Sequence, residues 1–261
     1  MKCPQNSQLQ SASISNPSTG GGTFRNIVET DPITVTPILH LSNGVRYTLS
    51  NVTLQPAGVA IIDINQGLQQ QGVASYATLS GYAELQYTWP WDPFCATIRN
   101  VDTAHSLIFT YGLQPTAPPP LHFSNPAPKA VGNTIEGMWW KQEANVTGFI
   151  ALANISAQPI QVTVGVTDNQ ANSIGQHSVT VSPQGMKLVE LDELTSSTST
   201  QGGILITSSA TTDNLIVNGG LEDQAVGYSA NLSLATDPVA TSGATPTTMA
   251  ELGSWQVQPT P

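Results

Sequence analysis

The sequence predicts an all-β protein of two antiparallel β-sandwiches that arose from an internal duplication. Pro-Ile-Thr-Val-Thr at 32–36 returns as Pro-Ile-Gln-Val-Thr at 159–163, and the turn segment at 52–58 returns at the same offset at 179–185. Short segments with alternating apolar residues are separated by turns roughly every 8 to 12 positions, which is typical of sandwich domains. Two copies of about 90 residues indicate two tandem domains.

The strands of the first copy follow from its apolar alternation. Ile33, Val35, Pro37 and Leu39 alternate with polar residues, and Phe109, Tyr111 and Leu113 share one face at the end of the copy. Strands are therefore expected at 33–39, 52–54, 59–64, 82–88, 95–101 and 105–113.

The second copy repeats this pattern. A block at 81–113 matches 202–234 without a gap. Strands are expected at 138–141, 160–166, 179–181, 186–191, 204–207, 215–218 and 228–234. Only 64–71 and 191–195 could hold a helical turn.

Composition sets the expected domain boundaries. Ser, Gln and Asn dominate the start of the chain, and six prolines fall between the copies, which favours a semi-extended connector. We expect a flexible lead-in over 1–22, a first sandwich over 23–114, a proline-rich connector over 115–137, a second sandwich over 138–235 and a flexible tail over 236–261.

The second copy carries turn and core motifs that resemble a known class of module. They are Pro183-Gln184-Gly185, the segment 188–191, the segment 202–206 and the closing segment 227–232. Together they resemble the immunoglobulin-like β-sandwich modules of secreted or cell-surface bacterial proteins. The resemblance covers about 24–113 and 149–234. It implies an immunoglobulin-like fold, tandem repetition and a surface location, and such modules mostly have no assigned activity.

The charge balance disfavours several partners. Only 9% of residues are charged, the net charge is −10, and the seven basic residues are scattered. Nucleic-acid binding needs clustered Lys and Arg, so no nucleic-acid partner is expected. No stretch approaches the 18 apolar residues of a membrane span, so no membrane insertion is expected.

The two cysteines are relevant to whether the protein is intracellular or secreted. Cys3 and Cys95 can form a disulfide that ties the lead-in to a late strand of the first copy; the alternative is two unrelated thiols, one in a flexible tail and one buried. No apolar segment of a signal peptide follows Met1, so the protein is either intracellular or numbered after removal of its signal. Composition favours a secreted or cell-surface protein.

The sequence offers little chemistry for catalysis. The serine-hydrolase, phosphate-loop and dinucleotide motifs are missing, and no cofactor is expected. Asp102 and His105 share a turn and could present two metal ligands. Asp102, however, matches Asp223 of the second copy, where Val226 replaces the histidine. A carboxylate that caps a hairpin turn explains both copies, so no metal site is predicted.

Paired acids would support glycoside hydrolysis. Glu84 and Asp92 are the candidates in the first copy. Glu190 occupies the repeat position of Asp63, which indicates a structural role for both. The other candidates of the second copy are Asp192 and Glu193, in what reads as a solvated turn.

Aromatic residues are the best candidates for ligand binding. Trp89 and Trp91 are held apart by a proline in a segment where the second copy has small polar residues, and Tyr87 precedes them. Trp139 and Trp140 should point to opposite faces of a strand, so one should be in the core and one exposed. Trp140 is the fourth candidate for ligand binding, beside Trp89, Trp91 and Tyr87. An exposed aromatic platform suits sugar rings or an apolar partner. The alternative is packing at a domain edge.

These observations favour a non-catalytic extracellular or cell-surface module for adhesion, recognition or spacing, whose partner is a glycan or a protein surface. Three alternatives stay open. One is a carbohydrate-binding protein that uses the Trp89/Trp91 segment. The second is a β-sandwich hydrolase, and the third is a structural subunit that assembles through strand edges.

Overall fold

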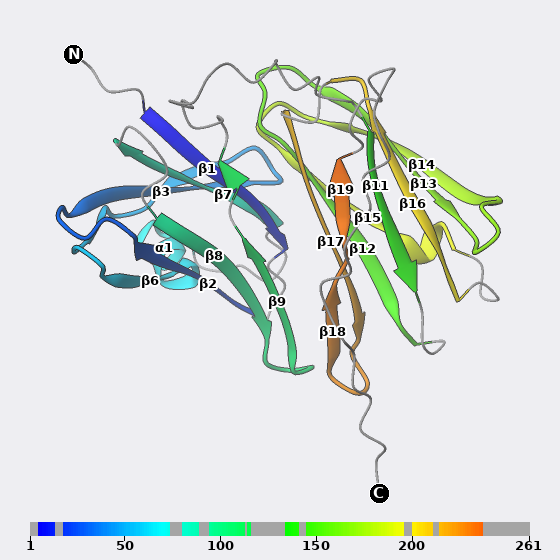
Figure 1. The fold of residues 1–261 in the computed structure, drawn as a ribbon, viewed down its shortest axis with the longest axis horizontal. Coiled ribbons are helices and arrows are strands. Elements are labelled where there is room, and N and C mark those ends of the chain that lie inside the picture. The colour runs from blue at the N-terminus through cyan, green and yellow to red at the C-terminus, as the bar shows by residue number, and fades with distance from the viewer. Residues whose placement is uncertain are drawn as a thin grey trace, which may run out of the picture.

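The computed structural model describes residues 5–13, 18–73, 80–88, 94–112, 114–115, 134–140, 145–195, 200–210 and 214–236. The predicted fold class is confirmed. The described chain forms two antiparallel β-sandwiches, which lie side by side in Figure 1.

The first sandwich consists of two sheets and a short helix. One sheet has the order β10-β1-β7-β3-β4, with β5 also paired to β3, and the other has the order β6-β2-β8-β9. Its elements are β1 (Gln5–Ser13), β2 (Ser18–Asn26), β3 (Ile33–Leu41), β4 (Arg46–Thr48), β5 (Val52–Leu54), β6 (Val59–Asp63), α1 (Ile64–Gln70), β7 (Ser80–Thr88), β8 (Phe94–Asp102), β9 (Leu107–Gly112) and β10 (Gln114–Pro115).

The second sandwich has the sheet orders β14-β13-β16-β11-β19 and β15-β12-β17-β18. Its elements are β11 (Thr134–Trp140), β12 (Thr147–Asn154), β13 (Ile160–Thr167), β14 (Ser173–Val181), β15 (Met186–Glu190), the 3-10 helix η1 (Leu191–Glu193), β16 (Gln201–Ser208), β17 (Leu215–Asp223), β18 (Tyr228–Asn231) and β19 (Leu234–Thr236).

The two sandwiches have the same topology, as the duplication predicts. When β1 is matched with β11, β2 with β12 and so on to β10 with β19, with β4 and β5 together matching β14, the strand orders of both sheets coincide. The register agrees as well, because Ile33 pairs with Leu54 in the first copy and Ile160 with Val181 in the second. The repeats in the sequence are therefore repeats in space.

The structure changes two of the expected boundaries. Instead of a flexible lead-in over 1–22, β1 pairs with β7 along its whole length, and β2 begins at Ser18. The Gln- and Ser-rich sequence of β1 has no apolar alternation, so it did not indicate a strand. Backbone hydrogen bonds to β7 hold this strand, and such bonds do not require a particular pattern of side chains. The second sandwich begins at Thr134, inside the expected connector. Most of the connector and the tail after Thr236 lie outside the described residues.

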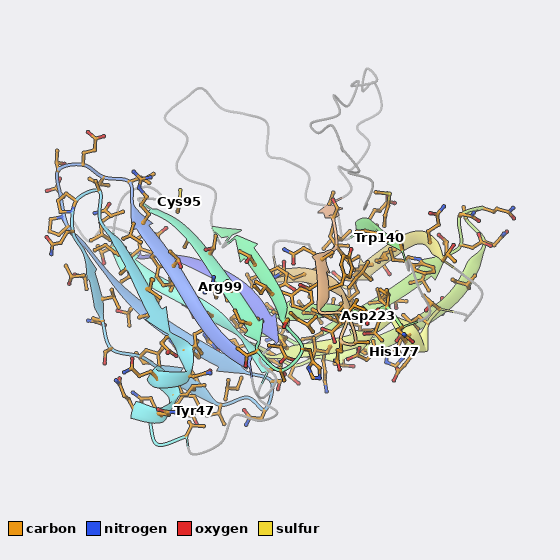
Figure 2. All side chains as sticks on the ribbon, turned by 90° about the horizontal axis from the view of Figure 1, so that it is seen from below. Tyr47, Cys95, Arg99, Trp140, His177 and Asp223 are labelled. Carbon is orange, nitrogen blue, oxygen red and sulfur yellow. The ribbon has the colours of Figure 1, made fainter. Side chains whose placement is uncertain are left out.

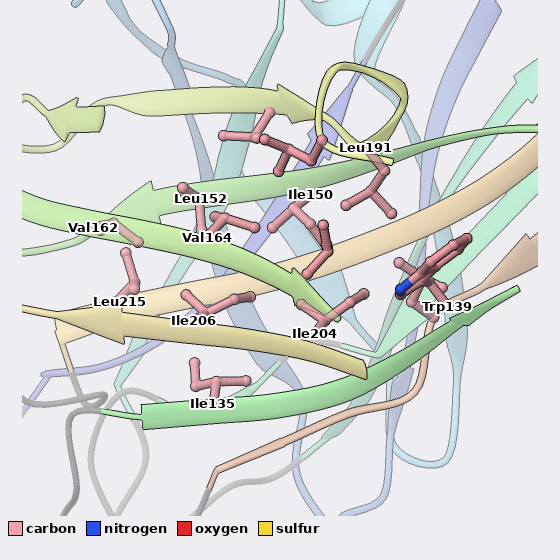
Figure 3. Packing of buried hydrophobic residues seen from close by; sticks show 14 of the residues in the cluster. Ile135, Trp139, Ile150, Leu152, Val162, Val164, Leu191, Ile204, Ile206 and Leu215 are labelled. Carbon is pink, nitrogen blue, oxygen red and sulfur yellow. The ribbon is translucent and has the colours of Figure 1, made fainter. Parts of the chain in front are cut away.

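The core of the second sandwich lies between its two sheets (Figure 3). Strict alternation on β13 turns Val162, Val164 and Val166 inward, where they meet Ile150 and Leu152 of the opposite sheet. Burial of such side chains contributes roughly 1.5–3 kcal/mol each. In the first sandwich, α1 closes the core with Ile64 and Leu68, which pack against Leu49 and Ile98.

A buried asparagine is repeated in both sandwiches. Nδ2 of Asn26 donates to the carbonyl oxygens of Asp31 and Gln55, and its Oδ1 accepts from the backbone N–H of Val28. Asn154 is also fully buried, and its Nδ2 and Oδ1 bond the backbone around residues 156–158 and the end of β14 in the same way. Each asparagine holds the chain turn that follows β2 or β12.

The sandwiches are joined by a buried apolar contact. β12 is buried on both faces: Ile150 and Leu152 face the core, and Ala151 and Ala153 pack against Tyr82 of the first sandwich. Met186 and Ile216 complete this cluster.

Aromatic and polar contacts extend the junction along β9. Phe109 meets Phe149 edge to face, with ring centroids 5.4 Å apart. Oγ of Ser229 accepts from the N–H of Ile108 and donates to its carbonyl oxygen, so one hydroxyl satisfies the exposed edge of β9 beside β18. The two sandwiches are thus held through both side chains and backbone.

Candidate functional site

The candidate site is a hollow of about 610 Å³ at one end of the second sandwich. It lies where the end of β11, the start of β16 and the β13–β14 turn come together. Trp140, one of the predicted binding residues, forms part of its wall, and Figure 2 shows this residue on the second sandwich. The residues lining it are Met138, Trp139, Trp140, Thr167, Asp168, Asn169, Ala171, Gln201, Gly202 and Gly203.

Strand alternation places the two tryptophans. Trp139 is fully buried in the core, and Trp140 is half-buried, packing against the core from the other face of β11. Nε1 of Trp139 donates to the carbonyl oxygen of Thr167 at 3.1 Å, which anchors the floor of the hollow. Trp139 is thus the tryptophan in the core, whereas Trp140 is half-buried and not exposed as expected, because it packs against the core cluster.

Two glycines keep the hollow open. A Cβ on Gly202 would collide with the carbonyl oxygen of Thr167, so β13 and β16 can approach this closely only at glycine. A Cβ on Gly203 would meet Oγ1 of Thr167 at 2.8 Å, the same atom that accepts from the Gly203 N–H. Because these two residues have no Cβ, the space between Met138 and the β13–β14 turn is not filled by a side chain of β16.

The polar side of the hollow is the β13–β14 turn. Oδ1 of Asp168 accepts from the N–H groups of Gln170 and Asn172 at 2.8 and 2.9 Å, and Oδ2 accepts from Nδ2 of Asn172 at 3.0 Å. These bonds from Asn172 and Gln170 lower the pKa of Asp168. The wall therefore carries a fixed negative charge at neutral pH, beside the amides of Asn169 and Gln201.

This arrangement combines an aromatic and thioether wall with carboxylate and amide groups. An apolar surface with a few convergent polar groups is the usual construction of a small-molecule site. A sugar ring has an apolar face and a rim of hydroxyls, so it matches both parts. Within the described part of the chain, no set of three His, Cys, Asp or Glu side chains is gathered as metal ligands would be.

The other predicted binding residues do not join this site. Trp89 and Trp91 lie outside the described residues. Tyr87 is only 2% exposed and belongs to the core of the first sandwich with Phe24 and Leu54, so its assignment to a binding surface is wrong. It shares the inward face of β7 with Leu85, and that alternation decides its place.

The predicted disulfide stays a prediction. Cys95 is an exposed, free cysteine on β8, which overturns the alternative expectation that it is buried, and Figure 2 shows it on the first sandwich. Cys3 lies outside the described residues.

The turn-capping role of Asp102 is confirmed. Its Oδ1 accepts from the N–H groups of Ala104 and His105 at 2.9 and 3.3 Å, and Asp223 accepts from Ala225 at 2.9 Å in the second copy. Nδ1 of His105 lies 2.8 Å from Oδ2 of Asp102, an addition found in the first copy.

The first-copy acid Glu84 is held by hydrogen bonds from two side chains. Oε2 of Glu84 lies 2.8 Å from Nε2 of buried His40, and Nε2 of Gln86 donates to Oε1. The bond to His40 lowers the pKa of Glu84 below its ordinary value. His40 also stacks on Tyr82 with centroids 4.5 Å apart. Sequence reasoning missed this cluster because His40 lies on β3 and its partners lie on β7, with no shared motif.

The second-copy acids lie at the end of β15 and in η1. Burial, and then the charges of Glu222, Asp192 and Glu193, raise the pKa of Glu190. The remaining candidate, Asp92, is outside the described residues.

In the part of the chain that is described, no helix is long and apolar enough to cross a bilayer.

Comparison with known proteins adds little. No family model matches the chain, and no curated protein matches it. Among solved structures, it is similar to a β-glucuronidase from glycoside hydrolase family 2 with a TM-score of 0.20 and 10% identity, over 84% of this chain and 23% of that enzyme's chain. A score of this size does not bear on fold or activity.

Proposed function

We propose that this protein is a non-catalytic extracellular or cell-surface module for adhesion, recognition or spacing, related to the immunoglobulin-like modules that its sequence resembles. The observation that supports the proposal is the buried contact between the sandwiches. A module that presents a surface at a fixed position needs rigidity between its domains.

The contact supplies that rigidity through several independent elements. Tyr82 is buried against Ala151 and Ala153, Phe109 packs on Phe149, and Ser229 bonds the edge of β9. Interdomain contacts that are small and polar permit relative motion, whereas a buried aromatic contact resists it. The two sandwiches would therefore act as one body.

A second candidate is carbohydrate binding. The observation that favours it is the hollow beside Trp140, where an indole and the Met138 side chain face Asp168 and two amides. An aromatic face packs on the apolar face of a sugar, and the carboxylate and amides accept and donate hydrogen bonds to its hydroxyls.

Binding without turnover is the property to test. The protein is titrated against an array of cell-surface polysaccharides and immobilised surface proteins, and the supernatants are analysed for released products. We expect saturable binding and no product. Product release that is lost in Glu190→Gln would contradict the proposal and favour the hydrolase alternative.

The glycan candidate has its own control. Trp140→Ala should weaken glycan binding about tenfold or more, because it removes the stacking surface, whereas Trp140→Phe retains an aromatic face and most of the affinity. Unchanged binding in Trp140→Ala would exclude the hollow as the glycan site.

A further inference from the structure

The contact inside the chain uses one face from each sandwich. The first sandwich contributes the outward face of the sheet that holds β1 and β7, and the second contributes the outward face of the sheet that holds β12, β15 and β17. Because the sandwiches share one topology, each carries both kinds of face. Within the described residues, one face of each kind is consequently left without a partner.

The first unpartnered face, here called the β11–β16 face, lies on the second sandwich at the place of β1 and β7. It is defined by Glu136, Met138, Trp140, Gly203 and Leu205. Met138 is 64% exposed and Leu205 is 42% exposed.

The other, here called the β2–β6 face, lies on the first sandwich at the place of β12 and β15. It is defined by Thr23, Arg25, Val59, Ile61 and the neighbouring Arg99. Val59 is 61% exposed and Ile61 is 76% exposed. Their repeat equivalents, Met186 and Leu188, belong to the apolar cluster between the sandwiches.

The shapes of the two faces are complementary, but the face that carries the projecting side chain is the opposite one from that in the internal contact. Inside the chain, Tyr82 projects from the first sandwich onto the small side chains Ala151 and Ala153. On the β11–β16 face, Gly203 stands at the repeat position of Tyr82, and the hollow opens there. On the β2–β6 face, Ile61 projects instead. In the internal contact the projecting side chain belongs to the β1–β7 kind of face. In the contact between copies it would belong to the β2–β6 face, and the β11–β16 face would supply the hollow that receives it.

The charges are complementary as well. The β11–β16 face carries exposed Glu136 and, beside the hollow, ionised Asp168. The β2–β6 face carries exposed Arg25 and Arg99, two of only seven basic residues in a chain of net charge −10. Its one acid within the described residues, Asp63, lies at the end of β6, where Oδ1 accepts from the N–H of Gln66. Opposite charges on the two faces favour their meeting and fix its orientation.

We propose that copies of this chain associate head to tail, with the β11–β16 face of one copy on the β2–β6 face of the next, repeating between chains the contact that joins the sandwiches within one. Such a heterologous contact leaves one free face at each end, so association continues beyond a dimer. The occupant of the hollow in this assembly is Ile61 of the neighbouring copy.

Sedimentation velocity on the full chain, over a roughly hundredfold range of protein concentration, tests the proposal. We expect the wild type to form a series of oligomers that grows with concentration. Leu205→Lys removes an apolar residue from one face, and the register places the new lysine opposite Glu136, which supports folding. Ile61→Glu puts an acid on the other face at an exposed position. Each variant alone should associate at least about tenfold more weakly.

Mixing the variants identifies the geometry. An equimolar mixture of Leu205→Lys and Ile61→Glu retains one intact face on each partner, so it should form heterodimers and nothing larger. Val226→Glu, at a 72% exposed position outside both faces, is the matched control and should assemble like the wild type. If Leu205→Lys fails to fold, Met138→Lys tests the same face.

Two results would overturn the proposal. A wild type that stays monomeric at every concentration excludes association through these faces and leaves the proposed function unaffected. Dimers that persist in either single variant indicate a symmetric contact in place of the head-to-tail one.

Discussion

The two sandwiches share a topology but use equivalent positions for different purposes. The buried asparagine and the turn-capping aspartate are present in both, at Asn26 and Asn154 and at Asp102 and Asp223. At the outward face, by contrast, the first copy has Tyr82 where the second has Gly203. The asparagine and the aspartate that hold turns are thus the same in both copies, whereas Tyr82 and Gly203 differ at the kind of face through which the first copy contacts the second.

The largest expected effect tests what the copies share. Asn26→Ala and Asn154→Ala should each lower the free energy of unfolding by about 3 kcal/mol, because each leaves several buried backbone groups without a partner. Urea denaturation of both variants measures it. Equal costs support one repeated structural role, and a neutral effect in either copy would show that the role was lost there.

A smaller effect separates the copies by pH. The bond from His40 lowers the pKa of Glu84, so its contribution to stability is present above the unfolded pKa of about 4.3 and is lost as pH falls through the lower folded pKa. At neutral pH, Glu84→Gln should lower stability by about 2 kcal/mol and should remove this part of the acid dependence.

The second copy provides the control, because Leu205 occupies the repeat position of Glu84. Leu205→Gln should leave the acid dependence of unfolding unchanged. Thermal unfolding between neutral and acidic pH compares the two variants. An acid dependence that survives Glu84→Gln would assign it to other carboxylates.

The smallest expected change in stability has opposite signs for Asp63 and for Glu190, which occupies the same repeat position in the second copy. Oδ1 of Asp63 caps α1 by accepting from the N–H of Gln66 at 2.9 Å, so Asp63→Ala should cost about 1 kcal/mol. Glu190 makes no such bond to η1. Burial raises its pKa, so stability is lost as pH rises through the folded pKa, and Glu190→Gln should stabilise at neutral pH by under about 1 kcal/mol. Chemical denaturation of both variants checks the signs. Destabilisation by Glu190→Gln would assign the carboxylate a structural bond.

Local sequence patterns predicted much of the fold. The repeats around 32–36 and 159–163 gave equivalent strands, and the alternation of β13 gave its buried face. The strand β1 was missed because its pairing with β7 depends on backbone groups and its Gln- and Ser-rich residues carry no period.

The candidate site was predicted only in part. Trp140 was among the predicted binding residues, although alternation alone could not tell which of Trp139 and Trp140 lies in the core. Asp168, Gly202 and the hollow depend on how β11, β13 and β16 meet at one end of a sandwich. Tyr82 was missed as a junction residue because alternation shows which residues lie on a face and says nothing about what covers that face. Contacts between separate domains leave no local period in the sequence.

Differential scanning calorimetry of the wild type and of Tyr82→Ala tests most directly whether the two copies form one rigid body. The buried junction predicts a single cooperative transition for the wild type. Tyr82→Ala removes the largest side chain from the apolar cluster at the junction, and the transition should then split into two, one for each sandwich. Two independent transitions already present in the wild type, and unchanged by Tyr82→Ala, would contradict the account.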